Sequence, residues 1–226
     1  MKIIDASYTF DRSQLVFKFL ADDRIDFRQL AKDLGYVYVD TGAMYRAIGL
    51  YVLRNDIDKN DEVAVVEAVS TINVSIVFED GQQVVLLNGE NVNGFIRTEE
   101  VGMMASGISG YAKVREKMVN LQRELAESTD VVMDGRDIGT VVLPNANPKI
   151  YLTASARVRA ERRAAELEAK GEPADIDTIE KDIIDRDYAD MHRAVSPLMK
   201  ADDAVEIDSS YMTIEEVQQA IIDLCK

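Results

Sequence analysis

The segment best suited to chemistry is a short run in which glycines alternate with charged side chains. Asp134-Gly135-Arg136-Asp137 follows an apolar run, Val131–Met133, and leads into Ile138-Gly139-Thr140. The glycines allow a sharp turn, while Arg136 offers a planar fork of donors beside the Asp137 carboxylate. Ligands of open α/β sheets bind outside the carboxyl ends of the strands. The segment predicts a polar ligand site at a strand end; a tight loop with a surface ion pair is the plainer alternative.

Arginines gather on two expected helices, at about 155–170 and 176–193. Guanidinium groups bind phosphate oxygens in pairs and neutralise the charge that develops in phosphoryl transfer, so these helices suit a lid over polyphosphate. Intervening glutamates leave a solvated helix face as the alternative, although Arg159 and Arg162 can share a face. The set is Arg157, Arg159, Arg162, Arg163, Arg186 and Arg193.

A third candidate is the segment Asp40-Thr41-Gly42-Ala43-Met44-Tyr45-Arg46. A strand, a glycine and a helix start follow one another here, which places Thr41 and Arg46 near the carboxyl edge of the sheet. An ordinary N-cap is the plainer role for Thr41.

These residues need a scaffold, and the hydrophobic pattern predicts strands alternating with helices. That alternation is typical of a parallel sheet covered by helices on both faces. Strands are expected at 36–40, 131–134, 149–154 and 204–208, with a further buried strand in 15–20. Helices are expected at 43–53, 62–70, 101–125, 155–170, 176–193 and from about 213, and another ends at Leu34 with Gly35 as its cap.

Two features interrupt this alternation. Residues 73–78 and 83–87 are strand-like and flank Glu79-Asp80-Gly81, which predicts a β-hairpin inserted into the parallel scaffold. Lys170-Gly171-Glu172-Pro173 is a polar break between two charged helices and the best candidate for a hinge.

Composition excludes several classes of function. The 226 residues suit one domain, and 41 acidic against 26 basic residues give a net charge of −15, which disfavours nucleic-acid partners. His192 has no partner histidine or cysteine, so neither a metal site nor a nucleophilic dyad is predicted. The single cysteine, Cys225, and the lack of an 18-residue apolar run or signal peptide lead us to expect a cytoplasmic protein without membrane spans.

Taken together, the motifs resemble the bacterial cytidylate kinase family over about residues 29–226. The resemblance rests on long, specific stretches rather than on one glycine pattern. These are Leu34–Arg46, Leu87–Val92, Ile96–Val101, Val114–Glu116, Met133–Pro144, and Arg186-Asp187 through Arg193–Leu198.

The resemblance implies a P-loop-kinase-like α/β fold within a single domain, 1–226. A substrate-binding lobe at about 41–112 would carry the β-hairpin, and a short helical lid would span about 156–193. The implied enzyme is a transferase of pyrimidine metabolism that moves a phosphoryl group from ATP, with Mg²⁺, to CMP or dCMP. The family also leads us to expect a monomer.

The resemblance also implies roles for individual residues. Arg46 and Arg115 would hold the acceptor phosphate, and Asp190 would contact the sugar hydroxyls. Thr41 would line the pocket. Ser106, Arg136 and Asp137 would read the cytosine, and Arg186, Arg193 and Arg162 would brace the transferred phosphoryl group.

One part of the family pattern is missing. Family members have a glycine-rich loop, Gly-x-x-x-x-Gly-Lys-Ser/Thr, whose amides wrap the ATP phosphates. This chain has no glycine before Gly35, and Lys18–Arg24 stands where the loop belongs, with Asp22 and Asp23 repelling phosphate. An altered reading frame, a degenerate homologue and a deliberate replacement are possible origins. Activity is therefore open, and the alternatives are a non-catalytic CMP-binding module or a kinase for another monophosphate such as UMP or AMP.

Overall fold

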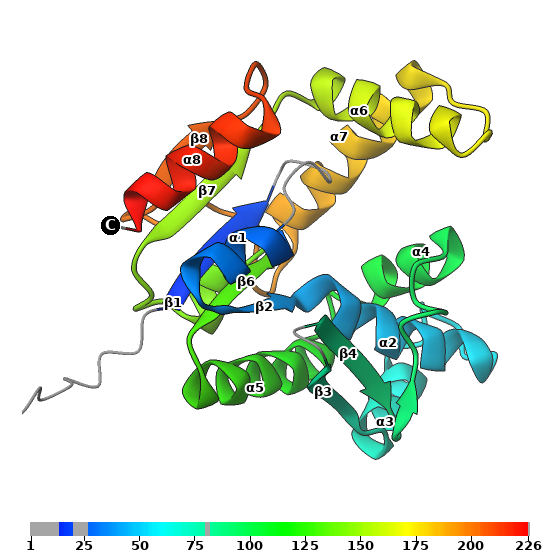
Figure 1. Cartoon of the computed structure of the whole chain (residues 1–226). Coiled ribbons are helices and arrows are strands. Elements are labelled where there is room, and N and C mark those ends of the chain that lie inside the picture. Colours follow the sequence, from blue (N-terminus) through cyan, green and yellow to red (C-terminus); the bar gives the residue numbers. More distant parts are fainter. Residues whose placement is uncertain (1–13, 20–26, 80–81, 226) are drawn as a thin grey trace, which may run out of the picture.

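A five-stranded parallel sheet forms the centre of the molecule (Figure 1). The computed structural model describes residues 14–19, 27–79 and 82–225. The strand order is β2-β6-β1-β7-β8, and every neighbouring pair is parallel. The predicted α/β class is confirmed, and the expected strand in 15–20 becomes the middle strand. The strands are β1 (Gln14–Phe19), β2 (Val37–Asp40), β6 (Val131–Gly135), β7 (Lys149–Thr153) and β8 (Val205–Asp208).

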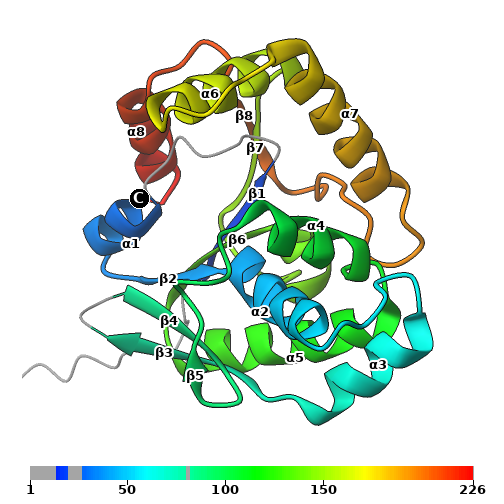
Figure 2. The ribbon, with the colours of Figure 1, turned by 90° about the vertical axis from the view of Figure 1, so that its right-hand side faces the viewer.

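Helices cover both faces of this sheet, as predicted. Figure 2 shows α1 (Phe27–Leu34) and α8 (Ile214–Leu224) on one side and α2 (Thr41–Arg54) on the other. Strand β6 contributes to the hydrophobic core on each face of the sheet, because successive side chains of a strand point to opposite faces. Val131 and Met133 pack toward α2 and α5 (Ala112–Ser128), whereas Val132 packs toward α1 and α8. All three are fully buried, which stabilises the fold by about 1.5–3 kcal/mol each.

Two helix ends test what the sequence predicted for Gly35 and Thr41. Gly35 follows α1 with a φ of +74°, which suits its predicted role as a cap. Thr41, however, is not the N-cap of α2: Asp40 is, and its Oδ1 accepts from the Ala43 amide at 2.8 Å. Thr41 is the first helical residue, and its hydroxyl donates to the Asp134 carbonyl at 2.5 Å. The plainer alternative for Thr41, an N-cap, is wrong because Asp40 is the extended residue and its side chain reaches the first helical turn.

The predicted hairpin is confirmed and belongs to a second sheet of order β3-β4-β5. Strands β3 (Val74–Glu79) and β4 (Gln82–Leu87) pair antiparallel, and the short β5 (Glu90–Asn91) was not predicted. Residues 80–81 of the expected turn lie outside the described residues. The Gln83 side chain bonds to both the amide and the carbonyl of Asp40, at 2.8 and 3.1 Å, which ties the hairpin to the edge of the parallel sheet.

The expected helix at 101–125 is two helices. α4 (Glu99–Ile108) ends and α5 begins after a break at 109–111, where Gly110 interrupts the pattern and the Ser109 carbonyl accepts from Arg115 instead of continuing a helix. A single π-helical turn, η1 (Ile138–Val142), was not predicted either.

Three further helices lie where the sequence placed them. The lower part of the molecule contains α3 (Glu62–Thr71), while α6 (Ala156–Ala169) and α7 (Ile176–His192) form an arm beyond the sheet (Figure 1). Gly171 in the expected break between α6 and α7 has a φ of +78°. The division into a lobe at 41–112 and a lid at 156–193 stays a prediction. Within the described ranges, no helix is long and apolar enough to span a membrane.

Candidate active site

A pocket of about 440 Å³ opens beside the carboxyl ends of β2 and β6. Charged side chains from distant parts of the chain meet in it, and among the described residues arginines outnumber carboxylates. This local excess of positive charge stands out in a chain of net charge −15 and suits an anionic ligand. The arginines are Arg28, Arg46, Arg97, Arg115, Arg136, Arg186 and Arg193, and the carboxylates are Asp40, Asp134, Asp137 and Asp190.

The innermost contact is an ion pair between Arg115 of α5 and Asp137, which precedes η1. Their side chains are only 4% and 5% exposed, so water screens the pair little. Arg115 also donates to the Ser109 carbonyl at 3.0 Å and lies over the Tyr45 ring, 5.5 Å from its centre. The guanidinium is therefore fixed in place before any ligand binds.

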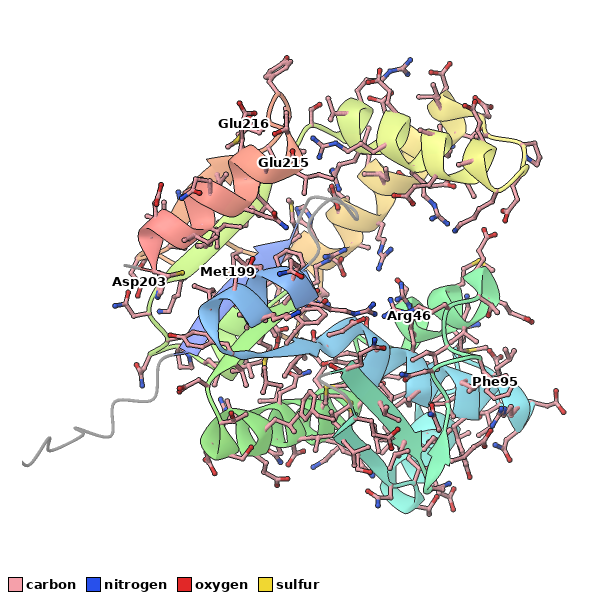
Figure 3. All side chains as sticks on the ribbon, viewed as in Figure 1. Arg46, Phe95, Met199, Asp203, Glu215 and Glu216 are labelled. Atoms are coloured by element: carbon pink, nitrogen blue, oxygen red, sulfur yellow. The ribbon has the colours of Figure 1, made fainter. Side chains whose placement is uncertain are left out.

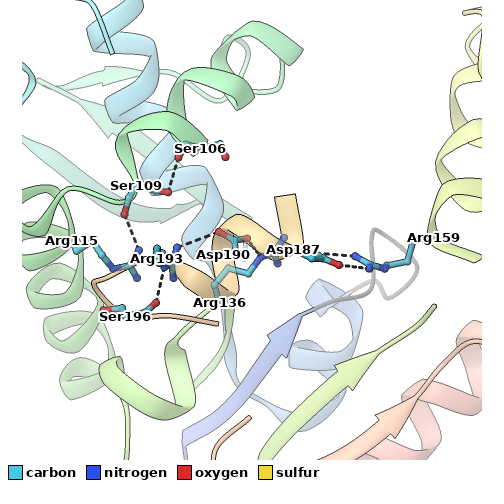
Figure 4. A network of polar contacts seen from close by, with 9 residues as sticks. All are labelled: Ser106, Ser109, Arg115, Arg136, Arg159, Asp187, Asp190, Arg193 and Ser196. Carbon is cyan, nitrogen blue, oxygen red and sulfur yellow. Dashed lines mark hydrogen bonds and ion pairs between the residues drawn. The ribbon is translucent and has the colours of Figure 1, made fainter. Parts of the chain in front are cut away.

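A second network joins the loop after β6 to α7. Arg136 donates through Nε to Asp190 Oδ2 at 3.0 Å, and Arg193 Nη1 lies 3.4 Å from Asp190 Oδ1. Arg193 also donates to the Ser196 carbonyl at 2.7 Å. Figure 4 shows that Asp190 stands between the two guanidinium groups. Asp190 therefore holds Arg136 and Arg193 at the same side of the pocket.

The arginines of α6 have structural partners. Arg159 is buried and forms a two-fold ion pair with Asp187 of α7, visible in Figure 4. Arg162 is buried as well and donates to the Ser209 carbonyl at 2.6 Å. A solvated helix face is therefore the wrong description of these two residues. The described lining of the pocket includes Arg186 and Arg193 but not Arg162, so the structure does not bring the three predicted phosphoryl-bracing arginines together.

Two carboxylates lie close together at the ends of β2 and β6. Burial, with the nearby charge of Asp40, raises the pKa of Asp134 to about 8. Burial also raises the pKa of Tyr38, which bonds to Asp134. Asp40 is paired with Arg97 at 2.5 Å. An uncharged Asp134 at neutral pH relieves the repulsion that two neighbouring carboxylates would otherwise feel.

Four buried polar atoms that line the pocket have no hydrogen-bond partner within the described part of the chain. They are Arg115 Nε, Arg193 Nη2, the Tyr45 hydroxyl and Asp134 Oδ1. Burial and the nearby positive charge of Arg115 lower the pKa of Arg193, so the site gains by receiving an anion. A buried donor without a partner is costly, and phosphate oxygens are suitable acceptors.

All the predicted site residues except Arg162 line this pocket. Figure 3 places Arg46 on α2, on the side facing the region between α4 and α7. Sequence reasoning assigned no role to the pocket residues Asp40, Arg97 and Asp134, although all three stand in segments that it singled out. The described residues hold no group of three potential metal-binding side chains. The predicted residues that line the pocket are Thr41, Arg46, Ser106, Arg115, Arg136, Asp137, Arg186, Asp190 and Arg193.

The first part of the chain is similar to an unrelated family. The sequence profile of the PSP1 C-terminal conserved region matches residues 1–40. The segment that departs from the kinase pattern thus has a likeness of its own, which none of the three suggested origins had included.

Residues 27–226, most of the chain, match the sequence profile of cytidylate kinase. A cytidylate kinase of Caldicellulosiruptor bescii is 49% identical over 195 residues, 86% of each chain. One of Lactobacillus johnsonii is 48% identical over 86% of this chain and 85% of its own. One of Flavobacterium johnsoniae is 46% identical over 87% and 88%. With this coverage and identity, the chain belongs to the cytidylate kinase family.

Proposed function

We propose that the chain is a cytidylate kinase by descent, whose pocket binds CMP or dCMP, the acceptor from which the family's reaction produces CDP or dCDP. The observation that carries this proposal is the set of guanidinium groups that line one pocket, are fixed by ion pairs and keep buried donors without a partner among the described residues. Family membership supports the same reaction. The donor that the family implies is ATP, accompanied by Mg²⁺.

The proposed roles follow from position and charge. Arg46 and Arg115 hold the acceptor phosphate, while Asp190 receives the sugar hydroxyls. Ser106 of α4, with Arg136 and Asp137, offers hydroxyl, guanidinium and carboxylate groups to the cytosine edge. Fixed donors of this kind bind well because little reorganisation is needed when the ligand arrives.

Two more arginines from α7 and its end complete the proposal. Arg186 and Arg193 line the pocket and neutralise the charge on the transferred group. In phosphoryl transfer, positioning and charge stabilisation supply most of the catalysis. Arg162 remains bonded to Ser209 and anchors α6 instead.

Calorimetric titration with CMP, dCMP, UMP and AMP tests the acceptor assignment without involving ATP. We expect the cytidine nucleotides to bind most tightly. Arg46→Ala should weaken CMP binding on the order of 100-fold, because it removes a charged pair of hydrogen bonds. Arg54→Ala is the matched control, since Arg54 lies on the same helix and pairs with Glu90 outside the pocket.

Two results would contradict the proposal: a folded chain that binds no cytidine nucleotide, or equal losses in the two arginine variants. Preferential binding of UMP or AMP would instead support the alternative acceptor. The proposal further places the protein in the cytoplasm as a monomer, which size-exclusion chromatography with light scattering tests.

A further inference from the structure

The middle strand continues through the point where a phosphate loop has to turn away from the sheet. β1 remains paired with β6 as far as Lys18, opposite Gly135. It remains paired with β7 as far as Phe19, opposite Leu152. Position 18 is where the first glycine of the loop falls in the family register. The backbone there is engaged in a regular parallel ladder, so its amides are not arranged around a phosphate.

The sequence that follows also lacks the required groups. A phosphate loop needs glycines for close approach, a lysine for the phosphates and a hydroxyl for Mg²⁺. Residues 20–26 read Leu-Ala-Asp-Asp-Arg-Ile-Asp and contain no glycine, lysine, serine or threonine. Three of the seven are aspartates, which repel a polyphosphate. MgATP therefore does not fit this connection, and no catalytic step is derived through it.

From the proposed function, we infer that this chain combines a complete acceptor site with a replaced donor site. The replaced segment lies within residues 1–40, which the PSP1 profile matches, and the cytidylate kinase profile begins to match only at residue 27. The segment that replaces the phosphate loop still includes β1, the middle strand of the sheet. The sheet and the acceptor pocket therefore form although the loop is missing. The chain thus keeps the binding site for the phosphoryl acceptor and lacks the binding site for the phosphoryl donor.

Loss of three charge-assisted hydrogen bonds sets the scale of the effect. MgATP binds on the order of 1,000-fold more weakly than in a chain with the loop, about 4 kcal/mol at 25 °C. Among the described residues before Gly35, Phe27 and Arg28 at the start of α1 line the pocket. Phe27 is apolar and stacks on Tyr38, with ring centres 5.9 Å apart. Of these two residues, only Arg28 carries a positive charge into the pocket. One guanidinium does not replace a loop of amides, a lysine and a metal ligand.

Calorimetric titration of the unmodified full-length chain with CMP, and separately with MgATP, is the decisive experiment. We expect ordinary CMP binding and no MgATP binding below millimolar concentration. MgATP binding in the low micromolar range would overturn the inference and leave the proposed function standing. Absence of CMP binding by the folded chain would overturn both.

A loop graft gives a second, independent measurement. The combined change Lys18→Gly, Asp22→Ala, Asp23→Gly, Arg24→Lys and Ile25→Ser restores the motif without altering chain length. We expect MgATP affinity to rise at least 100-fold, CMP-dependent ADP formation to appear and CMP affinity to stay the same. The matched control carries only Lys18→Gly, Asp22→Ala and Asp23→Gly, and should gain less than tenfold.

The graft is interpreted through its CMP binding, which reports that the pocket is intact. A graft that binds CMP yet gains no MgATP affinity contradicts the inference, as does a control that gains as much as the full graft. Should the graft lose CMP binding, the titration of the unmodified chain decides the question by itself.

Discussion

Removing one member of the buried Arg115–Asp137 pair is the most informative perturbation of the pocket. The Asp137→Asn variant keeps the size of the side chain and removes its charge. Arg115 is then left with the Ser109 carbonyl and the Tyr45 ring as its remaining contacts. Both side chains of the pair are at most 5% exposed, so water cannot solvate the charge that remains after the substitution.

The size of the effect follows from this burial. Breaking a buried ion pair by neutralising one partner typically costs about 3–5 kcal/mol, because the other charge stays buried and uncompensated. The amide of Asn retains a hydrogen-bond acceptor, which places Asp137→Asn near the lower limit, at about 3 kcal/mol. Arg115→Met should cost a similar amount because it leaves the carboxylate alone. The double variant should cost less than the sum of the two by at least about 2 kcal/mol.

Urea denaturation of the four proteins, followed by circular dichroism, measures these differences in the free energy of unfolding. CMP titration of the folded variants measures the second role of the pair. We expect Arg115→Met to lose CMP binding and the double variant not to regain it. Additive losses of stability, or a loss below about 1 kcal/mol in either single variant, would refute the interpretation of this contact as a tightly coupled buried pair.

Two further predictions concern stability. With its pKa raised to about 8, Asp134 keeps a proton in the folded chain that it releases near pH 4 in the unfolded chain. The free energy of unfolding should therefore fall by about 1.4 kcal/mol per pH unit between these two values. In Asp134→Asn, the urea midpoint should depend less on pH between about pH 5 and pH 8. An unchanged slope in this variant would mean that another group titrates. Gly49→Ala should cost about 1–3 kcal/mol, because the new Cβ would lie 2.9 Å from the Ala105 amide and 3.1 Å from the Val101 carbonyl. Gly102→Ala meets nothing within 4 Å and is the control in the same thermal melts; equal losses in the two variants would contradict the clash at Gly49.

Most of the architecture was predictable because it depends on local patterns. Apolar runs such as Val131–Met133 predict strands from burial on both faces, and the alternation with helices predicts a parallel sheet. The hairpin was foreseen from its turn residues. The last helix begins close to the expected residue 213, where Thr213 and Glu216 bond to each other's backbone in a capping box. Family motifs pointed to nine of the described residues that line the pocket.

The errors fall where two plausible local choices compete. Asp40 and Thr41 are both good N-caps, and the dihedral angles that favour Asp40 depend on how β2 meets α2. Likewise, the glycines of 101–125 are compatible with one bent helix or two. The structure chooses two because the Ser109 carbonyl is held by the Arg115 side chain.

The sequence by itself determined the fold class, the family and the absence of a recognisable phosphate loop, since each is written in contiguous residues. Only the tertiary structure decided which charges work together. Arg115 pairs with Asp137, Arg136 with Asp190, and Arg162 bonds to Ser209 instead of reaching the pocket. These partners are separated by 22 to 54 residues along the chain. Contacts of that kind depend on the relative placement of strands and helices, which no local spacing encodes.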